Sequence, residues 1–246
     1  WMSWSEYIDK VISCYTSIES LGIQPKDHVG IMSSTRWEWA ALDLALLGSG
    51  RVVVPMYPNL SDDDLLYIIN HSDIKILVIE NKAHLAQIER IKSNFEKKIQ
   101  ILTLGEIDFN KEITENLQNS FFNLCEKVNL QSMATIVYTS GTTGKPKGVV
   151  LLHEAIISEV TEAFELFGVK PHYKSLTILP FAHVLGRIEI WGSCWNGHSL
   201  AYAESIEKIK SNLKEVKPDF LIAVPRIFEK IYSGIMAQVE TVKYKQ

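Results

Sequence analysis

Residues Thr139 to Gly148 read Thr-Ser-Gly-Thr-Thr-Gly-Lys-Pro-Lys-Gly and follow an apolar, strand-like segment at 134–138. These ten residues contain three glycines, four hydroxyl side chains and two lysines. Glycines let the backbone turn successive N–H groups toward an anion, hydroxyls add neutral donors, and lysines add charges suited to phosphate. An ordinary β-turn with solvated lysines does not explain this clustering. The stretch therefore predicts a phosphate-binding loop directly after a strand.

Two commoner phosphate motifs do not account for this loop. The P-loop pattern G-x-x-x-x-G-K-[ST], counted from Gly141, places Pro146 where its second glycine should be. The dinucleotide-binding pattern fails at 48–50, because Val53 replaces its third glycine and the segment follows a helix-like stretch. Neither a P-loop nor a dinucleotide-binding motif is present.

The stretch from Tyr138 to Gly148 resembles the phosphate loop of the adenylate-forming superfamily at every fixed position of that pattern. This superfamily includes acyl-CoA synthetases, luciferases and peptide-synthetase adenylation domains. Other segments resemble its long-chain fatty acyl-CoA synthetases. The segment 179–184 looks like the motif that lines the carboxylate and acyl pocket, and 36–40, 55–58 and 224–232 look like that branch. The resemblance extends from Trp4 to about Glu240.

The chain departs from the family pattern in two places and lacks several family segments. Leu152 replaces a more usual threonine before His153, and Gly186 stands where long-chain members often have a glutamate before Arg187. The adenine motif, the ribose aspartate, the hinge and the catalytic lysine of the family are not found before Gln246. We therefore interpret 1–246 as an incomplete N-terminal AMP-binding domain without the small C-terminal domain. By this interpretation the 246 residues alone are inactive.

The resemblance implies a reaction and a set of site residues. The implied reaction is the ATP-dependent activation of a fatty acid to acyl-AMP, followed by thioester formation with CoA. His183 is the implied catalytic residue, near the substrate carboxylate, although composition alone is equally consistent with a structural histidine. Lys147 is expected to be the important loop charge, and Lys145, at a variable family position, to face solvent. The implied residues for ATP are Thr139, Ser140, Gly141, Thr142, Thr143, Gly144, Lys145, Pro146 and Lys147, with Thr139 also a ligand of Mg²⁺.

Two other functions are consistent with the same residues. The first is a ligase for a different carboxylic acid, either aromatic or medium-chain. The second is a nucleotide- or acyl-binding module that does not complete catalysis. Acid-dependent pyrophosphate exchange distinguishes the binding module from the ligases, and competition among acids distinguishes the ligases from each other.

Composition excludes several classes of protein. The 246 residues are 46% hydrophobic and 22% charged, which is typical of a globular protein. A formal net charge of −4 argues against a general nucleic-acid binder. Asp43 and Arg51 interrupt the longest apolar stretch, residues 40–56, so no run is long enough to span a membrane. The three cysteines have no C-x-x-C spacing, which argues against a structural zinc site. We expect a reduced, cytoplasmic protein without structural zinc, and a fatty acid substrate makes peripheral contact with a membrane surface plausible. No oligomeric state is predicted.

Strand-like and helix-like segments alternate along the chain, which predicts an α/β fold with largely parallel sheets flanked by helices. The expected organisation is a first lobe at 1–108, an irregular connection at 109–131 and a second lobe with the phosphate loop at 132–246. Asp62, Asp63 and Asp64 follow Ser61 and are interpreted as a capped helix start, not as a magnesium site. Strands are expected at 28–33, 51–55, 74–79, 99–104, 134–138, 149–152, 175–179 and 220–224, and helices at 5–21, 36–47, 61–69, 82–95, 154–167, 186–195, 204–216 and from 225 onward.

Overall fold

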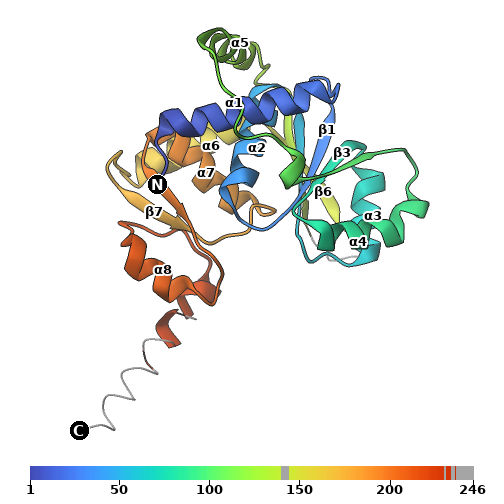
Figure 1. Ribbon diagram of the computed structural model, residues 1–246. Coiled ribbons are helices and arrows are strands. Elements are labelled where there is room, and N and C mark those ends of the chain that lie inside the picture. The colour runs from blue at the N-terminus through green and yellow to red at the C-terminus, as the bar shows by residue number, and fades with distance from the viewer. Residues whose placement is uncertain (140–143, 230, 234–235, 237–246) are drawn as a thin grey trace.

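A six-stranded sheet forms the framework of the computed structural model, which describes residues 1–139, 144–229, 231–233 and 236 (Figure 1). The strand order is β4-β3-β1-β2-β5-β6, with β6 antiparallel to β5 and all other pairs parallel. The strands are β1 (His28–Met32), β2 (Val52–Met56), β3 (Ile74–Ile79), β4 (Gln100–Thr103), β5 (Met133–Thr139) and β6 (Lys147–Leu152). The predicted α/β class with a mostly parallel sheet is confirmed.

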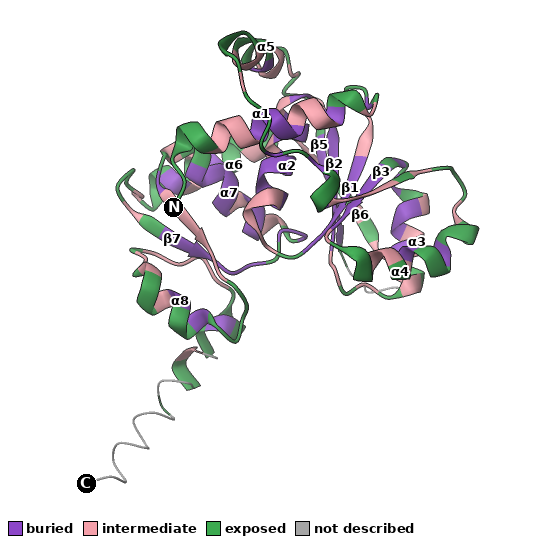
Figure 2. Ribbon diagram, viewed as in Figure 1, coloured by how far each residue is buried: buried purple, intermediate pink, exposed green. Residues whose placement is uncertain are grey.

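Helices cover both faces of this sheet, and its central strands are buried on both sides (Figures 1 and 2). Val53 of β2 packs toward one face, whereas Val52 and Val54 pack toward the other. This two-sided burial explains why the strands read as continuous apolar runs. The helices on the first face are α1 (Trp4–Ser20), α2 (Trp37–Gly48), α6 (His153–Leu166) and α7 (Val184–Asn196), and those on the second are α3 (Asp62–His71) and α4 (Lys82–Ile91).

The helix start expected at Ser61 is confirmed. The Ser61 hydroxyl oxygen accepts a hydrogen bond from the Asp64 N–H at 3.1 Å, which is the geometry of an N-cap. Asp62, the first residue of α3, accepts hydrogen bonds from Gln87 and Arg90 of α4 at 3.0 Å each. The acidic run therefore starts a helix and joins it to its neighbour.

A second, two-stranded parallel sheet consists of β7 (Lys174–Thr177) and β8 (Ser199–Tyr202), with α8 (Ile209–Val216) packed beside it. The strand expected at 220–224 is wrong: Phe220 makes one isolated bridge to Ser175 and the ladder does not continue. β8 lacks a run of β-branched residues and was not predicted. The helix expected from 204 begins only at Ile209, because Asn212 accepts the Glu204 N–H at 3.2 Å and the chain turns there.

The stretch expected to be irregular contains a helix, α5 (Glu115–Cys125). The Thr114 hydroxyl accepts the Leu117 N–H at 3.3 Å and caps it. Phe121 is its one fully buried side chain, with its ring 5.0 Å from that of Tyr15 in α1. Leu117, Phe121 and Cys125 recur every four residues, which is a helical spacing, but the polar residues around them led to the expectation of an irregular connection.

The sheet also continues across the expected lobe boundary. β5 pairs with β2 through Val53 and Thr135, and β6 then extends the sheet by one more strand. Residues 1–108 and 132–152 therefore contribute to one sheet. Short 3₁₀ helices at Lys92–Asn94 and Leu104–Glu106 complete the elements of this part.

Candidate functional site

The predicted phosphate loop joins β5 to β6 at the carboxyl edge of the sheet. β5 runs parallel to β2, so Thr139 lies at the edge where β1, β2 and β3 also end. Lys147 pairs with Thr139 across the hairpin, and Gly148 pairs with Tyr138. The two limbs of the loop, 138–139 and 144–148, therefore leave the sheet at the same edge. This is the edge at which open α/β sheets bind ligands.

The tip of the loop lies outside the described residues, so the structure does not place Ser140, Gly141, Thr142 and Thr143. Gly144 has a φ of +111°, a backbone conformation that side chains rarely adopt. Lys145 and Lys147 are exposed and Pro146 is half-buried. The described limbs thus present two lysine charges to solvent at the sheet edge.

Gly148 provides the space for the ring of Tyr138. A Cβ at this position would lie 2.9 Å from Cγ2 of Ile136 and 3.2 Å from Cζ of Tyr138. The Tyr138 ring is buried across the hairpin, and its hydroxyl lies 2.7 Å from Nδ1 of His71. Burial raises the pKa of Tyr138 to about 12, and nearby Tyr67 adds to the rise. Tyr138 and Gly148, which match fixed positions of the motif, therefore depend on each other sterically.

Lys145 does not simply extend into water. Its Nζ atom lies 5.2 Å from the ring centroid of Tyr67 in α3, within the range of a cation–π contact. The side chain is exposed, as expected, but its ammonium group is held over an aromatic ring. The sequence contained no signal for this partner, because Tyr67 lies outside every motif.

His183 caps the N-terminus of α7. Its Nδ1 accepts a hydrogen bond from the Leu185 N–H at 3.2 Å, so the proton of the neutral ring is assigned to Nε2. The residue is exposed, which leaves the Nε2 side of the ring free for other contacts. His183 therefore combines a structural capping bond with an accessible ring nitrogen at a helix N-terminus.

The His183 segment and the phosphate loop lie at the same edge of the large sheet. The Thr35 hydroxyl, in the turn after β1, donates to the Leu179 carbonyl at 2.9 Å. This bond holds the 179–183 segment against the carboxyl edge at β1, and β5 lies two strands away in the sheet. Strands are about 4.8 Å apart, so β1 and β5 are separated by about 10 Å. The two segments that the resemblance singles out are thereby brought to one edge.

A buried ion pair between Arg187 and Asp43 joins α7 to α2. Arg187 Nη1 also donates to the Thr135 hydroxyl of β5 at 2.6 Å, and Trp191 Nε1 donates to Asp43 at 3.0 Å. Burial raises the pKa of Asp43, and the charge and hydrogen bonds of Arg187 act in the opposite direction. Sequence reasoning treated Asp43 only as an interruption of an apolar run. Two opposite charges inside apolar helices were the available signal.

Gly186, where the resemblance leads us to expect a glutamate, is closely packed. An added Cβ would lie 2.7 Å from the Pro180 carbonyl oxygen and 3.1 Å from that of Leu179. Both contacts are to backbone atoms, which cannot rotate away. The lack of a side chain at Gly186 therefore lets α7 start close to the 179–180 turn.

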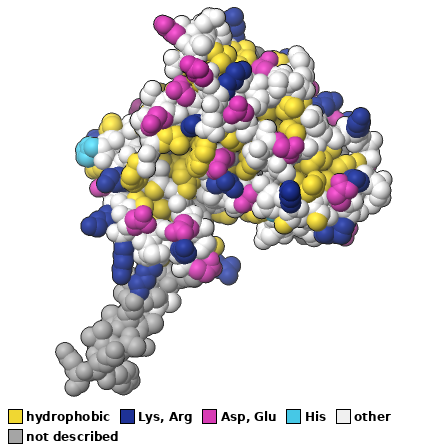
Figure 3. All heavy atoms as spheres, in the orientation of Figure 1, with side chains coloured by type: hydrophobic (Ala, Val, Ile, Leu, Met, Phe, Trp, Pro, Cys, Tyr) yellow, Lys and Arg dark blue, Asp and Glu magenta, His cyan; other side chains and the backbone are white. Residues whose placement is uncertain are grey.

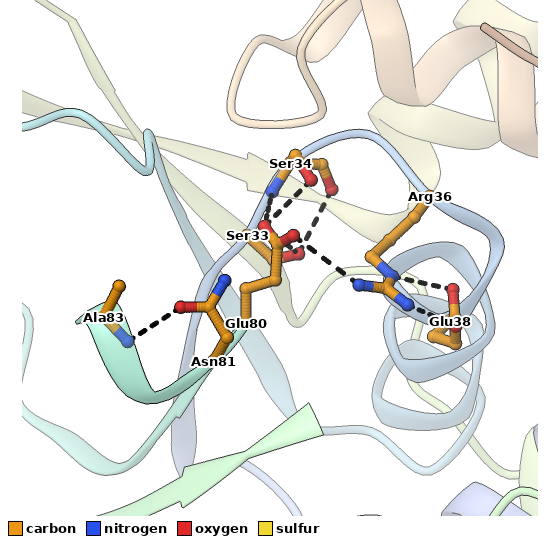
Figure 4. A network of polar contacts seen from close by, with 7 residues as sticks. All are labelled: Ser33, Ser34, Arg36, Glu38, Glu80, Asn81 and Ala83. Carbon is orange, nitrogen blue, oxygen red and sulfur yellow. Dashed lines mark hydrogen bonds and ion pairs between the residues drawn. The ribbon is translucent and has the colours of Figure 1, made fainter. Parts of the chain in front are cut away.

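A second polar network lies at the carboxyl edge, where β1 and β3 end (Figure 4). Glu80 accepts hydrogen bonds from the Ser34 N–H and hydroxyl, both at 2.8 Å, and Arg36 bridges Glu80 and Glu38. Burial acts to raise the pKa of Glu80, but the Ser34 bonds and the Arg36 charge outweigh it and lower that pKa. Glu80 thus stays ionised and holds the turn after β1 that carries Thr35.

A groove of about 960 Å³, lined by both apolar and polar side chains, lies between α1 and the β8–α8 region, where hydrophobic side chains gather in Figure 3. Its lining includes Trp4, Trp37, Ile190, Tyr202 and Val216. Among the described residues, neither His183 nor any residue implied for ATP lines it. The groove is therefore separate from the described limbs of the predicted phosphate loop.

Within the described residues, no cluster of three or more His, Cys, Asp or Glu side chains is arranged to hold a metal ion. The donor offered by the described loop limbs is the Thr139 hydroxyl, at an exposed strand end. Such a site fits a Mg²⁺ ion that is held mainly by phosphate oxygens and water. In the same described part of the chain, every helix is too short or too polar to cross a bilayer.

Comparisons with known proteins match nearly the whole chain to AMP-binding enzymes. The family model described as AMP-binding enzyme matches residues 1–246. The chain is 28% identical over 253 residues to fatty acyl-CoA synthetase A of Dictyostelium discoideum, covering 96% of this chain and 37% of that protein. It is 27% identical over 237 residues to the long-chain-fatty-acid–CoA ligase FadD15 of Mycobacterium bovis, covering 93% and 40%. The chain therefore spans about two fifths of the length of these relatives.

The fold has a close structural counterpart. The N-terminal domain of FACL13 from Mycobacterium tuberculosis, in an inhibitor-bound crystal structure, superposes with a TM-score of 0.79 at 22% identity. The match covers 93% of this chain and 57% of that one. At this level of identity the likeness establishes a shared fold.

Proposed function

The chain belongs to the AMP-binding enzyme family, and we propose that the full-length protein is a long-chain fatty acid–CoA ligase. The observation that carries the proposal is the β5–β6 hairpin, which brings Thr139 and Lys147 together at the carboxyl edge of the sheet. His183 lies on a segment held at that same edge through Thr35. The names of the relatives, fatty acyl-CoA synthetase and long-chain-fatty-acid–CoA ligase, support the choice of substrate.

The proposed reaction has two steps. The carboxylate oxygen of the fatty acid attacks the α-phosphorus of ATP, and the bond to the β-phosphate oxygen breaks, giving acyl-AMP and pyrophosphate. The CoA thiolate then attacks the acyl carbon and AMP leaves with the electron pair of the broken bond. The first step brings two anions together, so cations and N–H donors must hold the triphosphate while the attack is aligned.

The phosphate loop supplies these groups in the proposal. Lys147 starts β6, so its backbone is anchored to the sheet, and the glycines of the loop are proposed to let backbone N–H groups point at phosphate. Thr139 is the proposed protein ligand of Mg²⁺, which when bound neutralises phosphate charge. His183 is proposed to contact the substrate carboxylate through Nε2–H, because Nδ1 is occupied by the capping bond.

The experiment is acid-dependent ATP–pyrophosphate exchange with the full-length protein and a series of acids from C8 to C18, with aromatic acids beside them. We expect exchange with the C12–C18 acids. Lys147→Ala should reduce the exchange strongly, and Lys111→Ala, an exposed lysine outside the motifs, should leave it unchanged. Exchange restricted to aromatic or medium-chain acids would change the proposed substrate. ATP binding without exchange for any acid would favour a binding module and overturn the ligase proposal.

We also propose that the protein acts in the cytoplasm and makes peripheral contact with membranes, where fatty acids partition. No nucleic-acid partner is proposed for a chain with a formal net charge of −4. Co-sedimentation of the full-length protein with vesicles that contain oleate tests the contact. Recovery of all protein in the supernatant at low ionic strength would contradict it.

A further inference from the structure

Helix α3 contacts both limbs of the predicted phosphate loop, although none of its residues belongs to a recognised motif. On the first limb, His71 meets Tyr138, the residue directly before Thr139. On the second limb, Tyr67 meets Lys145, directly after Gly144. Tyr67 and His71 are four residues apart and therefore lie on the same side of the helix.

The contact on the first limb is a partly buried hydrogen bond between exposed His71 and buried Tyr138. His71 Nδ1 and the Tyr138 hydroxyl are 2.7 Å apart, and the two rings meet edge-on with centroids 5.8 Å apart. Gly148 leaves no side chain to displace the Tyr138 ring from this position. The bond therefore locates the end of β5, from which the loop starts.

The contact on the second limb is joined to the first through stacked rings. The rings of Tyr67 and His71 stack with centroids 5.2 Å apart and an interplanar angle of 25°. The Lys145 ammonium lies over the other part of this stack, 5.2 Å from the Tyr67 centroid. Asp63 and Glu96 line the same hollow of about 630 Å³ as Lys145, Tyr67 and His71. A continuous row of contacts thus runs from Lys145 through α3 to Tyr138.

Helix α3 is a firm support for these contacts. Leu65, Ile68 and Ile69 are buried against the sheet, and Asp62 bonds to Gln87 and Arg90 of α4. A helix fixed in this way can restrict the positions of the two strand ends that it touches. Restricting a loop before its ligand arrives reduces the entropy lost on binding.

We propose that Tyr67 and His71 are positioning residues for the phosphate loop. They hold its two limbs at the spacing that nucleotide binding requires, and Lys145 acts as a tether to α3 and not as a phosphate ligand. This inference rests on the proposed binding of ATP by the loop. It assigns a role in ATP affinity to a helix that carries no motif residue.

The test uses the full-length protein, with direct ATP binding and ATP–pyrophosphate exchange measured side by side. Tyr138→Phe keeps the ring over Gly148 and removes only the hydroxyl. We expect it to raise both the Kd and the KM for ATP about fivefold, the size expected for one net hydrogen bond, with kcat nearly unchanged. His71→Leu should have the same effect, and the double variant should be no worse than either single variant, because one bond is lost in all three.

Tyr67 provides a matched pair of variants. Tyr67→Leu should raise the KM for ATP about two- to fivefold, because it removes the ring beneath Lys145, whereas Tyr67→Phe should restore nearly wild-type values. Lys97→Met is the control: it removes a lysine paired with Asp73 beside α3 and touches neither limb. It should leave the KM for ATP unchanged.

The outcomes separate the two proposals. Wild-type protein that binds no ATP refutes the proposed function, and the positioning role fails with it. Wild-type protein that binds ATP and exchanges pyrophosphate, with Kd and KM for ATP unaltered in Tyr138→Phe, His71→Leu and Tyr67→Leu, refutes the positioning role alone. Variants that lose only thermal stability or kcat, with ATP affinity unchanged, assign these residues a purely structural role and also refute it.

Discussion

Replacing Glu189 by glutamine should change how the stability of the protein depends on pH. Glu189 lies on α7 and is fully buried, and neither carboxyl oxygen has a hydrogen-bond partner within the described residues. Burial raises the pKa of this carboxyl to about 7, and the nearby hydroxyls of Thr177 and Ser175 offset the rise only in part. The folded protein therefore favours the protonated form.

The sign and size of the effect follow from this shift. A carboxyl whose pKa is raised on folding contributes stability that is fully present below its unfolded pKa of 4.5 and lost as pH rises through about 7. The full loss is about 3 kcal/mol at roughly 1.4 kcal/mol per pKa unit. Glutamine is neutral at every pH and keeps the same shape. Glu189→Gln should therefore match the wild type near pH 4.5 and exceed its stability by about 3 kcal/mol at pH 8.

Urea unfolding of the full-length protein, followed by far-UV circular dichroism at several values from pH 4.5 to 8, measures this difference. Glu165→Gln, which changes an exposed glutamate on α6, is the matched control and should stay within about 0.5 kcal/mol of the wild type at every pH. A Glu189→Gln variant with the same stability difference at pH 5 and pH 8, or one less stable than the wild type at pH 8, would refute the reasoning.

His198 also contributes to the pH dependence of stability. Burial lowers the pKa of this histidine to about 4, and its ring stacks on Phe164 with centroids 5.5 Å apart. Its contribution to stability is present above pH 6.5 and is lost as pH falls through about 4, opposite in direction to that of Glu189. In the wild type the two dependences oppose each other. The stability of Glu189→Gln should accordingly fall more steeply on acidification than that of the wild type.

Three further substitutions have defined outcomes. Leu152→Thr supplies the N-cap side chain that α6 lacks and should add about 0.5–1 kcal/mol, measured as a higher Tm, and a lower Tm would contradict this. Gly186→Ala places a Cβ 2.7 Å from the Pro180 carbonyl and should cost about 1–3 kcal/mol in urea unfolding, and no loss would show that the turn relaxes. Arg187→Met leaves Asp43 buried without its partner and should cost about 3–5 kcal/mol, and the double variant with Asp43→Asn should recover a large part; no recovery would argue against the pair as the cause.

Local features of the chain were sufficient to predict much of the fold. Apolar runs bounded by glycine and polar turns marked β1, β2 and β3, because a strand buried on both faces needs apolar side chains at nearly every position. Ser61 marked the start of α3, because an N-cap depends only on residues within one turn. The elements that were missed, α5 and β8, bury few side chains or have weak local preferences, and they form where a neighbour is available.

The phosphate-binding character of 139–148 is local, since its glycines, hydroxyls and lysines are contiguous and their spacing is an intrinsic property of the chain. The distant residues that support this segment are known only from the folded structure. The Tyr138 hydroxyl lies against His71, 67 positions earlier in the chain, and Arg187 pairs with Asp43, 144 positions away. Such contacts depend on strand order and helix packing, and no local pattern encodes them. The physical reason is that hydrogen bonds and ion pairs act over a few ångströms in space, whatever the separation along the chain.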